Sequence, residues 1–147
     1  LSVLLLQNNG LYTDDATLLA YLDTHASGWK YTQTVPPVVT DITYTFPSMV
    51  KIEWTPILYS QDGGAYRVYC STTPGGPYTY LIETDDKSAG SITINNLEPG
   101  KTYYFTVRTD TPANPNNPKN EILSSNSNEV EITVPAIRSI YLPILLK

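Results

Sequence analysis

Four stretches of the chain alternate apolar and polar residues, and this alternation limits the fold more than any other feature of the sequence. Successive side chains of a β-strand point to opposite faces, so each stretch is typical of a strand with one face in a core and the other in water. The inward-facing members are Val50, Ile52 and Trp54, then Tyr66, Val68 and Cys70, then Tyr103, Phe105 and Val107, and finally Val130, Ile132 and Val134. The pattern predicts a mainly β fold.

Three further segments resemble strands, and turn residues separate them. The segments are residues 38–46, 78–83 and 91–97, and the turns are marked by Asp62-Gly63-Gly64, Pro74-Gly75-Gly76-Pro77 and Pro99-Gly100. Seven strands at this spacing predict an immunoglobulin-like sandwich over residues 35–134. Its start is placed at Val35-Pro36-Pro37, because the two prolines make a stiff, extended junction between domains.

The predicted sandwich carries residues that point to a family. Trp54 lies on its second strand, Tyr66-x-Val68 on its third, and Leu97-x-Pro99-Gly100-x-x-Tyr103 precedes its sixth. In these motifs the sequence resembles a fibronectin type III domain, a fold that commonly serves as a spacer or a binding module. The resemblance implies that Tyr103 is the tyrosine-corner residue, with its ring in the core and its hydroxyl bonded to the backbone near Leu97.

Two departures limit what this resemblance implies. Lys101 stands where the family often has threonine, which is a surface change with little structural consequence. The adhesive tripeptide Arg-Gly-Asp is absent from the sequence, so integrin-type binding is not implied.

A different pattern opens the chain. Its first eleven residues follow the spacing L-x-x-L-x-L-x-x-N-x-L, filled by Leu1, Leu4, Leu6, Asn9 and Leu11. This spacing resembles a leucine-rich repeat, which implies a strand over residues 1–6 with Leu4 and Leu6 facing the interior of a solenoid. An ordinary amphipathic strand followed by a turn is the alternative.

A helix is predicted after this strand. Thr13 is the expected N-cap and Gly28 the expected stop, with an apolar stripe formed by Leu18, Tyr21 and Leu22. Residues 11–34 resemble the closing cap of bacterial leucine-rich repeat proteins, in which Trp29 would cover the open end of the solenoid. We therefore expect residues 1–34 to be the last repeat and cap of a longer protein.

Charge and composition exclude several classes of function. The formal net charge is -5, and the lysines and arginines are scattered singly, so no basic stripe is available for nucleic acid. The longest apolar runs are far shorter than the ~20 residues of a membrane-spanning helix. A single cysteine, Cys70, excludes an internal disulfide.

No constellation of catalytic or metal-ligating residues is recognisable. His25 is the only histidine and has no second ligand nearby in the sequence, and Cys70 continues the inward face of its strand without a neighbouring base. Asp85, Asp86 and Asp110 lack the alternating ligand pattern of a calcium loop. We expect no enzymatic activity, no cofactor, and no catalytic or metal site.

Two features are candidate recognition surfaces. Arg67, Tyr69, Tyr104 and Arg108 should project from the outer side of adjacent strands, where rings and guanidinium groups could stack on a sugar or a protein. Cross-strand pairing that only stabilises the sheet is the alternative. The loop 110–121, rich in proline and asparagine, could carry binding or could be passive.

The expected function is that of a non-catalytic binding or spacer region in a secreted or cell-surface leucine-rich repeat protein, acting in adhesion or protein–protein interaction. The alternative is an accessory, carbohydrate-contacting module of an extracellular polysaccharide-degrading enzyme. The partner would be a protein or a polysaccharide, and the apolar residues 1–6 could drive self-association. The apolar tail 135–147 should dock on a surface, as an added strand or otherwise.

Overall fold

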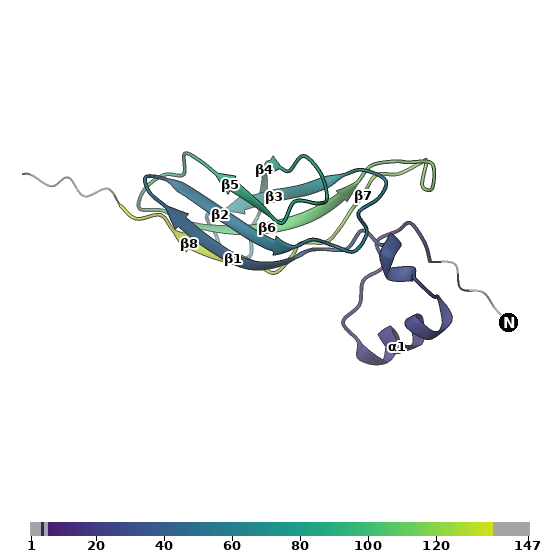
Figure 1. Ribbon diagram of the computed structural model, residues 1–147. Helices are drawn as coiled ribbons and strands as arrows, with labels where there is room; N and C mark the ends of the chain where they lie inside the picture. The colour runs from purple at the N-terminus through teal and green to yellow at the C-terminus, as the bar shows by residue number, and fades with distance from the viewer. Residues whose placement is uncertain (1–3, 5, 137–147) are drawn as a thin grey trace, which may run out of the picture.

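Two antiparallel sheets packed face to face form most of the protein in the computed structural model, which describes residue 4 and residues 6–136 (Figure 1). The first sheet has the order β1-β2-β5. In the second sheet β3 lies between β4 and β6, and β6 also pairs with both β7 and β8. The strands are β1 (Val38–Thr45), β2 (Met49–Thr55), β3 (Ala65–Ser71), β4 (Thr79–Glu83), β5 (Ser91–Ile94), β6 (Thr102–Thr111), β7 (Ile122–Leu123) and β8 (Val130–Thr133).

The predicted sandwich is confirmed, but the described chain has eight strands where seven were expected. The additional strand, β7, is only two residues long and pairs with Asp110 and Thr111 at the end of β6. A two-residue strand has no period to detect, so alternation could not reveal it.

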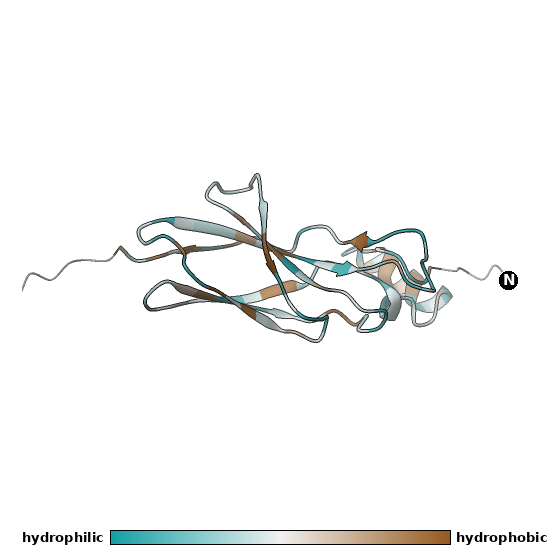
Figure 2. Ribbon diagram, turned by 90° about the horizontal axis from the view of Figure 1, so that it is seen from above, coloured by the Kyte–Doolittle hydropathy of each residue, from teal (hydrophilic) through white to brown (hydrophobic). Residues whose placement is uncertain are grey.

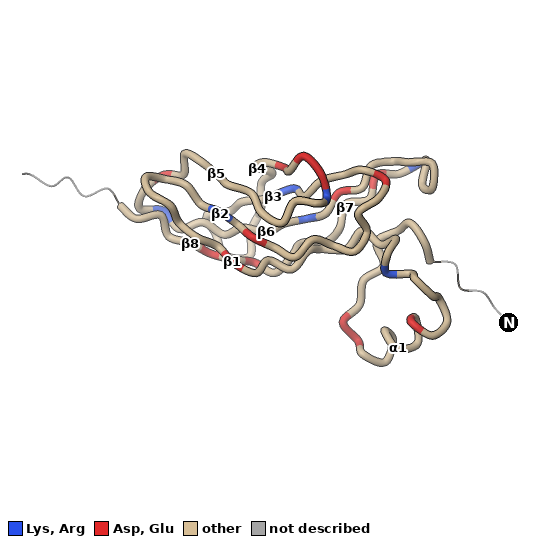
Figure 3. The backbone as a smooth tube through the Cα atoms, viewed as in Figure 1, with Lys and Arg blue, Asp and Glu red and all other residues tan. Residues whose placement is uncertain are grey.

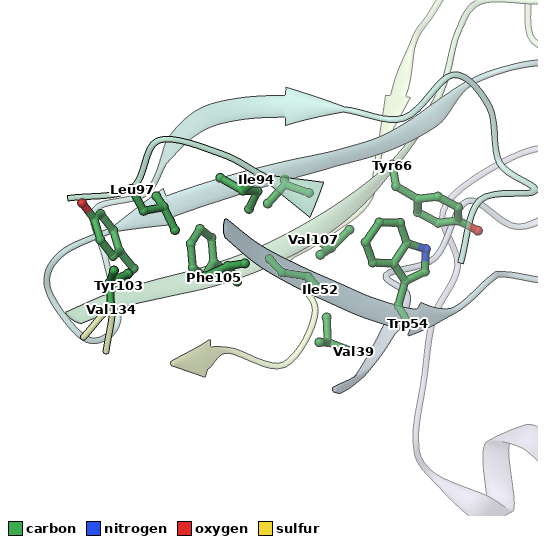
Figure 4. Close-up of a cluster of buried hydrophobic side chains, with 12 residues drawn as sticks. Val39, Ile52, Trp54, Tyr66, Ile94, Leu97, Tyr103, Phe105, Val107 and Val134 are labelled. Atoms are coloured by element: carbon green, nitrogen blue, oxygen red, sulfur yellow. The ribbon is translucent and has the colours of Figure 1, made fainter. Parts of the chain in front are cut away.

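The alternating residues meet between the two sheets. Figure 4 shows Trp54 beside Tyr66, and their ring centroids are 5.2 Å apart. Figure 2 shows the corresponding hydrophobic segments of the strands lying between more hydrophilic loops. The buried members of this core are Val39, Val50, Ile52, Trp54, Tyr66, Val68, Ile94, Leu97, Tyr103, Phe105, Val107 and Val134.

Several positions differ from the predicted faces. Val130 and Ile132 were expected to be buried but are half-buried, and Ser71, on the expected outer face, is 8% exposed. Cys70 was expected to be buried, but it is only half-buried, because β3 nears its end there and the side chain lies at the margin of the core. Thr106 was expected to face water but is 2% exposed, and it lies opposite Tyr69 of β3.

The expected role of Tyr103 is confirmed. Its hydroxyl accepts a hydrogen bond from the backbone N–H of Glu98, with 3.0 Å between the atoms. The turn before it needs a left-handed residue, which Gly100 supplies at a φ of 81°, and the Gly100 N–H donates to the carbonyl of Val134 at 2.8 Å.

The helix α1 (Ala16–His25) is present, but its predicted start and face are wrong. Asp15, not Thr13, is the N-cap, because its carboxylate accepts a hydrogen bond from the Leu18 N–H at 2.8 Å. The buried face carries Leu22, whereas Leu18 and Tyr21 are exposed. The helix ends before Gly28, whose φ of 74° starts the short 3-10 helix η1 (Trp29–Thr32).

A small second core holds this N-terminal segment together. Trp29 is 4% exposed and packs with Leu22 and Ala26. Partly buried leucines complete the cluster, namely Leu4, Leu6, Leu11 and Leu19. The expected strand over residues 1–6 and the tail 137–147 lie largely outside the described residues. Within the described part, no helix is long and apolar enough to cross a membrane.

Candidate interaction surface

The four residues proposed as a recognition surface lie on one face of the larger sheet. Arg67 of β3 pairs directly with Arg108 of β6, and Tyr69 lies two residues further along β3. Tyr104 pairs with Ser71, so it lies further along the same face of β6. The predicted placement on adjacent strands is therefore observed, and the contacts decide what the side chains can do.

Three carboxylates surround the guanidinium of Arg67. Its Nη2 atom lies 2.6 Å from Glu121 and 3.3 Å from Asp110, and its Nε atom lies 3.2 Å from Glu83. Burial, aided by the hydrogen bond with Glu121, raises the pKa of Asp110 to about 6. Hydrogen bonds to Asp110 and Arg67 lower the pKa of Glu121. Arg67 thus ties β4, β6 and the end of the loop 112–121 together.

Arg108 and Tyr69 contact each other. The guanidinium carbon of Arg108 lies 5.7 Å from the centroid of the Tyr69 ring, and its Nε donates to the carbonyl of Ser124 at 2.5 Å. The rings of Tyr69 and Tyr80 form a T-shaped pair with their centroids 6.0 Å apart. The Tyr69 ring is consequently engaged by the protein itself on two sides.

Two side chains that the sequence analysis did not single out are exposed on the same sheet. Tyr80 and Leu81 of β4 are 50% and 42% exposed, whereas the predicted residue Tyr104 is half-buried. The β4 sequence, Thr-Tyr-Leu-Ile-Glu, does not alternate between apolar and polar residues. In the structure, a register shift against β3 leaves Leu81 without a partner on that strand. The tyrosine in the predicted strand 78–83 was the only feature of the sequence that pointed to this exposed surface.

A groove of about 440 Å³ lies beside β4, and we call it the β4–β5 groove. It is lined by Ile82, Glu83, Thr84, Asp85, Asp86, Ser88, Ala89, Ser91 and Ile92. The Asp86 carboxylate accepts hydrogen bonds from the hydroxyl and the N–H of Ser88, at 2.6 and 2.7 Å, which lowers its pKa. Asp85 and Asp86 are two of the aspartates whose sequence pattern does not match a calcium loop.

The loop 112–121 is closed by its own hydrogen bonds. The carboxamide oxygen of Asn114 accepts from the N–H groups of Asn116 and Asn117, at 2.9 and 3.0 Å. The Asn116 side chain donates to Asp62 at 3.0 Å, which fastens the loop to the β2–β3 connection. The loop is therefore attached at its tip as well as through Glu121.

A buried lysine lies near the N-terminal segment. Lys87 is 2% exposed, and its amine donates to the Gln61 carbonyl at 2.6 Å and to the Thr111 hydroxyl at 3.1 Å. The amine also lies 4.0 Å from the centroid of the Tyr59 ring. Burial lowers the pKa of Lys87 to about 8. Lys87 is a single lysine in a polar loop, and nothing in the sequence predicts that its side chain is buried.

His25 and Cys70 are in separate parts of the molecule. His25 stacks on Tyr21 with centroids 4.1 Å apart, and its Nδ1 lies 2.8 Å from the Tyr21 carbonyl. Burial raises the pKa of the Cys70 thiol, which disfavours the reactive thiolate. Among the described residues, no group of three histidine, cysteine or acidic side chains is placed to hold a metal ion.

Comparison with solved structures places the sandwich in the fibronectin type III fold. No protein-family model and no curated protein matches the sequence. A Fn3-like protein from Clostridium thermocellum is 20% identical, with a TM-score of 0.50 over 72% of this chain and 100% of that one. The fibronectin type III domain of the human KIAA0970 protein is 18% identical, with a TM-score of 0.50 over 94% of this chain and 96% of that one.

A third similar structure is much longer. The β-1,2-glucanase from Parabacteroides distasonis is 22% identical with a TM-score of 0.55, over 73% of this chain but only 14% of the glucanase. At these identities the likeness shows the fold alone, which is a fibronectin type III sandwich.

Proposed function

We propose that the chain is a non-catalytic protein-binding or spacer region of a secreted or cell-surface protein. In this proposal, residues 1–34 are the last coil and cap of a leucine-rich repeat solenoid, and residues 35–134 are a fibronectin type III domain that carries it. The observation that supports the solenoid most directly is a parallel bridge between Asn9 and Gln33.

Asn9 and Gln33 are 24 residues apart in the chain and lie side by side in parallel. The Thr34 N–H donates to the Asn9 carbonyl at 2.7 Å. Successive coils of a leucine-rich repeat solenoid also lie parallel, one repeat of about 20 to 29 residues apart. The path from the Asn9 turn through α1 and back to Gln33 therefore has the direction and the length of one such coil.

Side-chain amides complete this coil. Asn9 donates to the Leu6 carbonyl at 3.1 Å and accepts from the Leu11 N–H at 3.0 Å. Gln33, which is 1% exposed, bonds to the same two backbone groups, at 2.5 Å to Leu6 and 2.9 Å to Leu11. A buried glutamine that satisfies the backbone of the preceding turn is suited to closing a solenoid.

A spacer must transmit orientation, and the junction between the two parts is bonded. The Thr34 hydroxyl donates to that of Thr111 at 2.8 Å, and the Thr109 hydroxyl donates to the Val35 carbonyl at 2.7 Å. Thr34, Thr109 and Thr111 are all buried. These bonds favour a fixed angle between coil and sandwich.

A carbohydrate-contacting accessory module remains the second candidate. Tyr80 and Tyr104 on the outer face, together with the fold shared with part of a β-1,2-glucanase, favour it. The contacts of the other residues argue against it, because Arg67 is bound by three carboxylates and Tyr69 is engaged by Arg108.

A titration separates the two candidates. Soluble β-1,2-glucan, xylan and cello-oligosaccharides are added to the intact chain while the ring signals of Tyr80 and Tyr104 are followed by NMR. The proposed function predicts no change and no turnover. A saturable change that Tyr80→Ala abolishes, and that the exposed control Tyr12→Ala preserves, would favour the carbohydrate module. Hydrolysis of any of these glycans would contradict both candidates.

The solenoid is tested separately. Further copies of the leucine spacing upstream in the coding sequence would support it.

A further inference from the structure

The outer side of β4 is not paired with any described strand. The sheet order makes β3 its only neighbour. The free N–H and C=O groups along such an edge are a template for another strand, and proteins usually protect edges with lysine or proline. Strand β4 contains neither, and Tyr80 and Leu81 on it are exposed. Within the part of the chain that the structure describes, neither a neighbouring strand nor the composition of β4 protects this edge.

The free edge of the other sheet lies on the opposite side of the β4–β5 groove. Strand β5 pairs only with β2 among the described strands, and the connection 84–90 crosses from one sheet to the other. The groove floor contains Ile82, Ala89 and Ile92, which are partly buried and pack against the core. An extended segment placed along β4 could bury apolar side chains on this floor.

The rim of the groove is acidic. Glu83, Asp85 and Asp86 line it, and none of its lining residues is lysine or arginine. Figure 3 shows the acidic segment 85–86 as the red stretch following β4. Lys87, the next residue, points its amine inward to Gln61 and Thr111 instead. Glu83 contacts Arg67, but Asp85 forms no ion pair with a described residue.

From this combination we propose that the β4 edge and the β4–β5 groove bind an extended cationic segment of a partner protein by strand addition. Main-chain hydrogen bonds to β4 would supply affinity, and lysine or arginine at alternate positions would meet Glu83 and Asp85. The charge of the groove favours a basic segment over an acidic or neutral one. This inference rests on the proposed protein-binding function and names the chemistry of the partner.

The test uses three blocked octapeptides with the intact chain at low ionic strength. The first alternates lysine and valine, the second replaces each lysine by glutamate, and the third is the lysine peptide with alternate backbone nitrogens methylated. NMR of the chain's amides should show saturable shifts at residues 79–86 with the first peptide only. Amide exchange along β4 should slow on binding, and added salt should weaken it.

Two variants with the same change in charge sharpen the test. Asp85→Asn should weaken binding of the lysine peptide about two- to five-fold, the range expected for one exposed ion pair. Asp14→Asn, an exposed position before α1, should leave the affinity unchanged. Equal effects of the two variants would mean that only the net charge attracts the peptide, and would overturn the inference.

Other outcomes overturn it as clearly. Equal binding of the methylated peptide would exclude strand addition, and absence of binding would exclude the site. Shifts at Asp85 and Asp86 with calcium chloride alone would assign the groove to a metal ion. If the peptides fail and the glycans also leave the protein unchanged, the inference falls while the spacer role stands. Glycan binding would contradict the proposed function itself.

Discussion

The hydroxyl of Thr34 donates a hydrogen bond to the hydroxyl of Thr111, with 2.8 Å between the two oxygen atoms, and both side chains are fully buried. Thr34 lies at the end of the N-terminal segment and Thr111 ends the longest strand of the sandwich, so this bond crosses the boundary predicted from the prolines. The Lys87 amine donates to the same Thr111 hydroxyl. The junction is thus a buried polar network, and its loss should have a measurable cost.

Removal of residues 1–34 should leave a folded but weakened sandwich. The large core from Val39 to Val134 contains no residue of the N-terminal segment, so residues 35–136 should still unfold cooperatively. The loss of the bonds from Thr34, and the exposure of Thr111, should lower the free energy of unfolding by about 1–3 kcal/mol. Chemical denaturation followed by tryptophan fluorescence measures both quantities. A non-cooperative transition would contradict the division into two units.

Trp54→Ala should destabilise the protein far more than Tyr69→Ala. Trp54 is 4% exposed, and its indole N–H donates to the Ala89 carbonyl at 2.9 Å, so truncation leaves a cavity and an unpaired carbonyl. A cost of about 3–5 kcal/mol is expected for Trp54→Ala. Tyr69 lies on the outer face, where its loss removes contacts with Arg108 and Tyr80 but makes no cavity. Similar costs in urea denaturation would mean that the faces of β2 and β3 are not as described.

The sandwich could be predicted because its signals are local and repeated. Alternation placed Ile52 and Val68 correctly, and the Leu-x-Pro-Gly spacing located Tyr103 and the bond that its hydroxyl forms. The predicted helix N-cap was wrong because Thr13 and Asp15 both suit that position, and the sequence does not show that the Asp15 carboxylate is the group that accepts the Leu18 N–H.

The contacts of the outer face could not be predicted in the same way. Patterning places Arg67 and Arg108 on one face but gives no register for the carboxylates that come from β4 and from residue 121. The inward orientation of Lys87 depends on Tyr59 and Gln61, which lie 26 or more residues away in the chain. Long-range pairing of this kind leaves no periodic trace in a sequence.

Asp110→Asn should change how stability depends on pH. The pKa of Asp110 is raised to about 6 from 3.8, so its contribution to stability is fully present below about pH 4 and is lost as the pH rises through 6. The wild type should therefore lose about 1–2 kcal/mol relative to Asp110→Asn between pH 4.5 and 7.5. Glu121, whose pKa is lowered, has the opposite effect, because its contribution to stability is lost as the pH falls below about 4.5.

Urea denaturation at a series of pH values measures this difference, and the carboxyl carbon shift of Asp110 reports its titration directly. The exposed variant Asp14→Asn serves as the control and should parallel the wild type. A titration midpoint for Asp110 below 4 would contradict the expected burial of its charge.

Lys87→Met should reveal the cost of the buried amine at the junction. The pKa of Lys87 is lowered to about 8 from 10.5, because burial disfavours its charge. Above pH 8 the native state releases this proton while the unfolded chain keeps it, so wild-type stability should rise between pH 8 and 10.5 relative to Lys87→Met, by about 1–3 kcal/mol. The variant keeps an unbranched, apolar side chain beside Tyr59, although it is one atom shorter, and it donates no hydrogen bond to Gln61 or Thr111. Comparison with the exposed control Lys30→Met removes the effect of net charge. Parallel stability curves for Lys87→Met and the wild type would show that the amine keeps its ordinary pKa and that water reaches the junction.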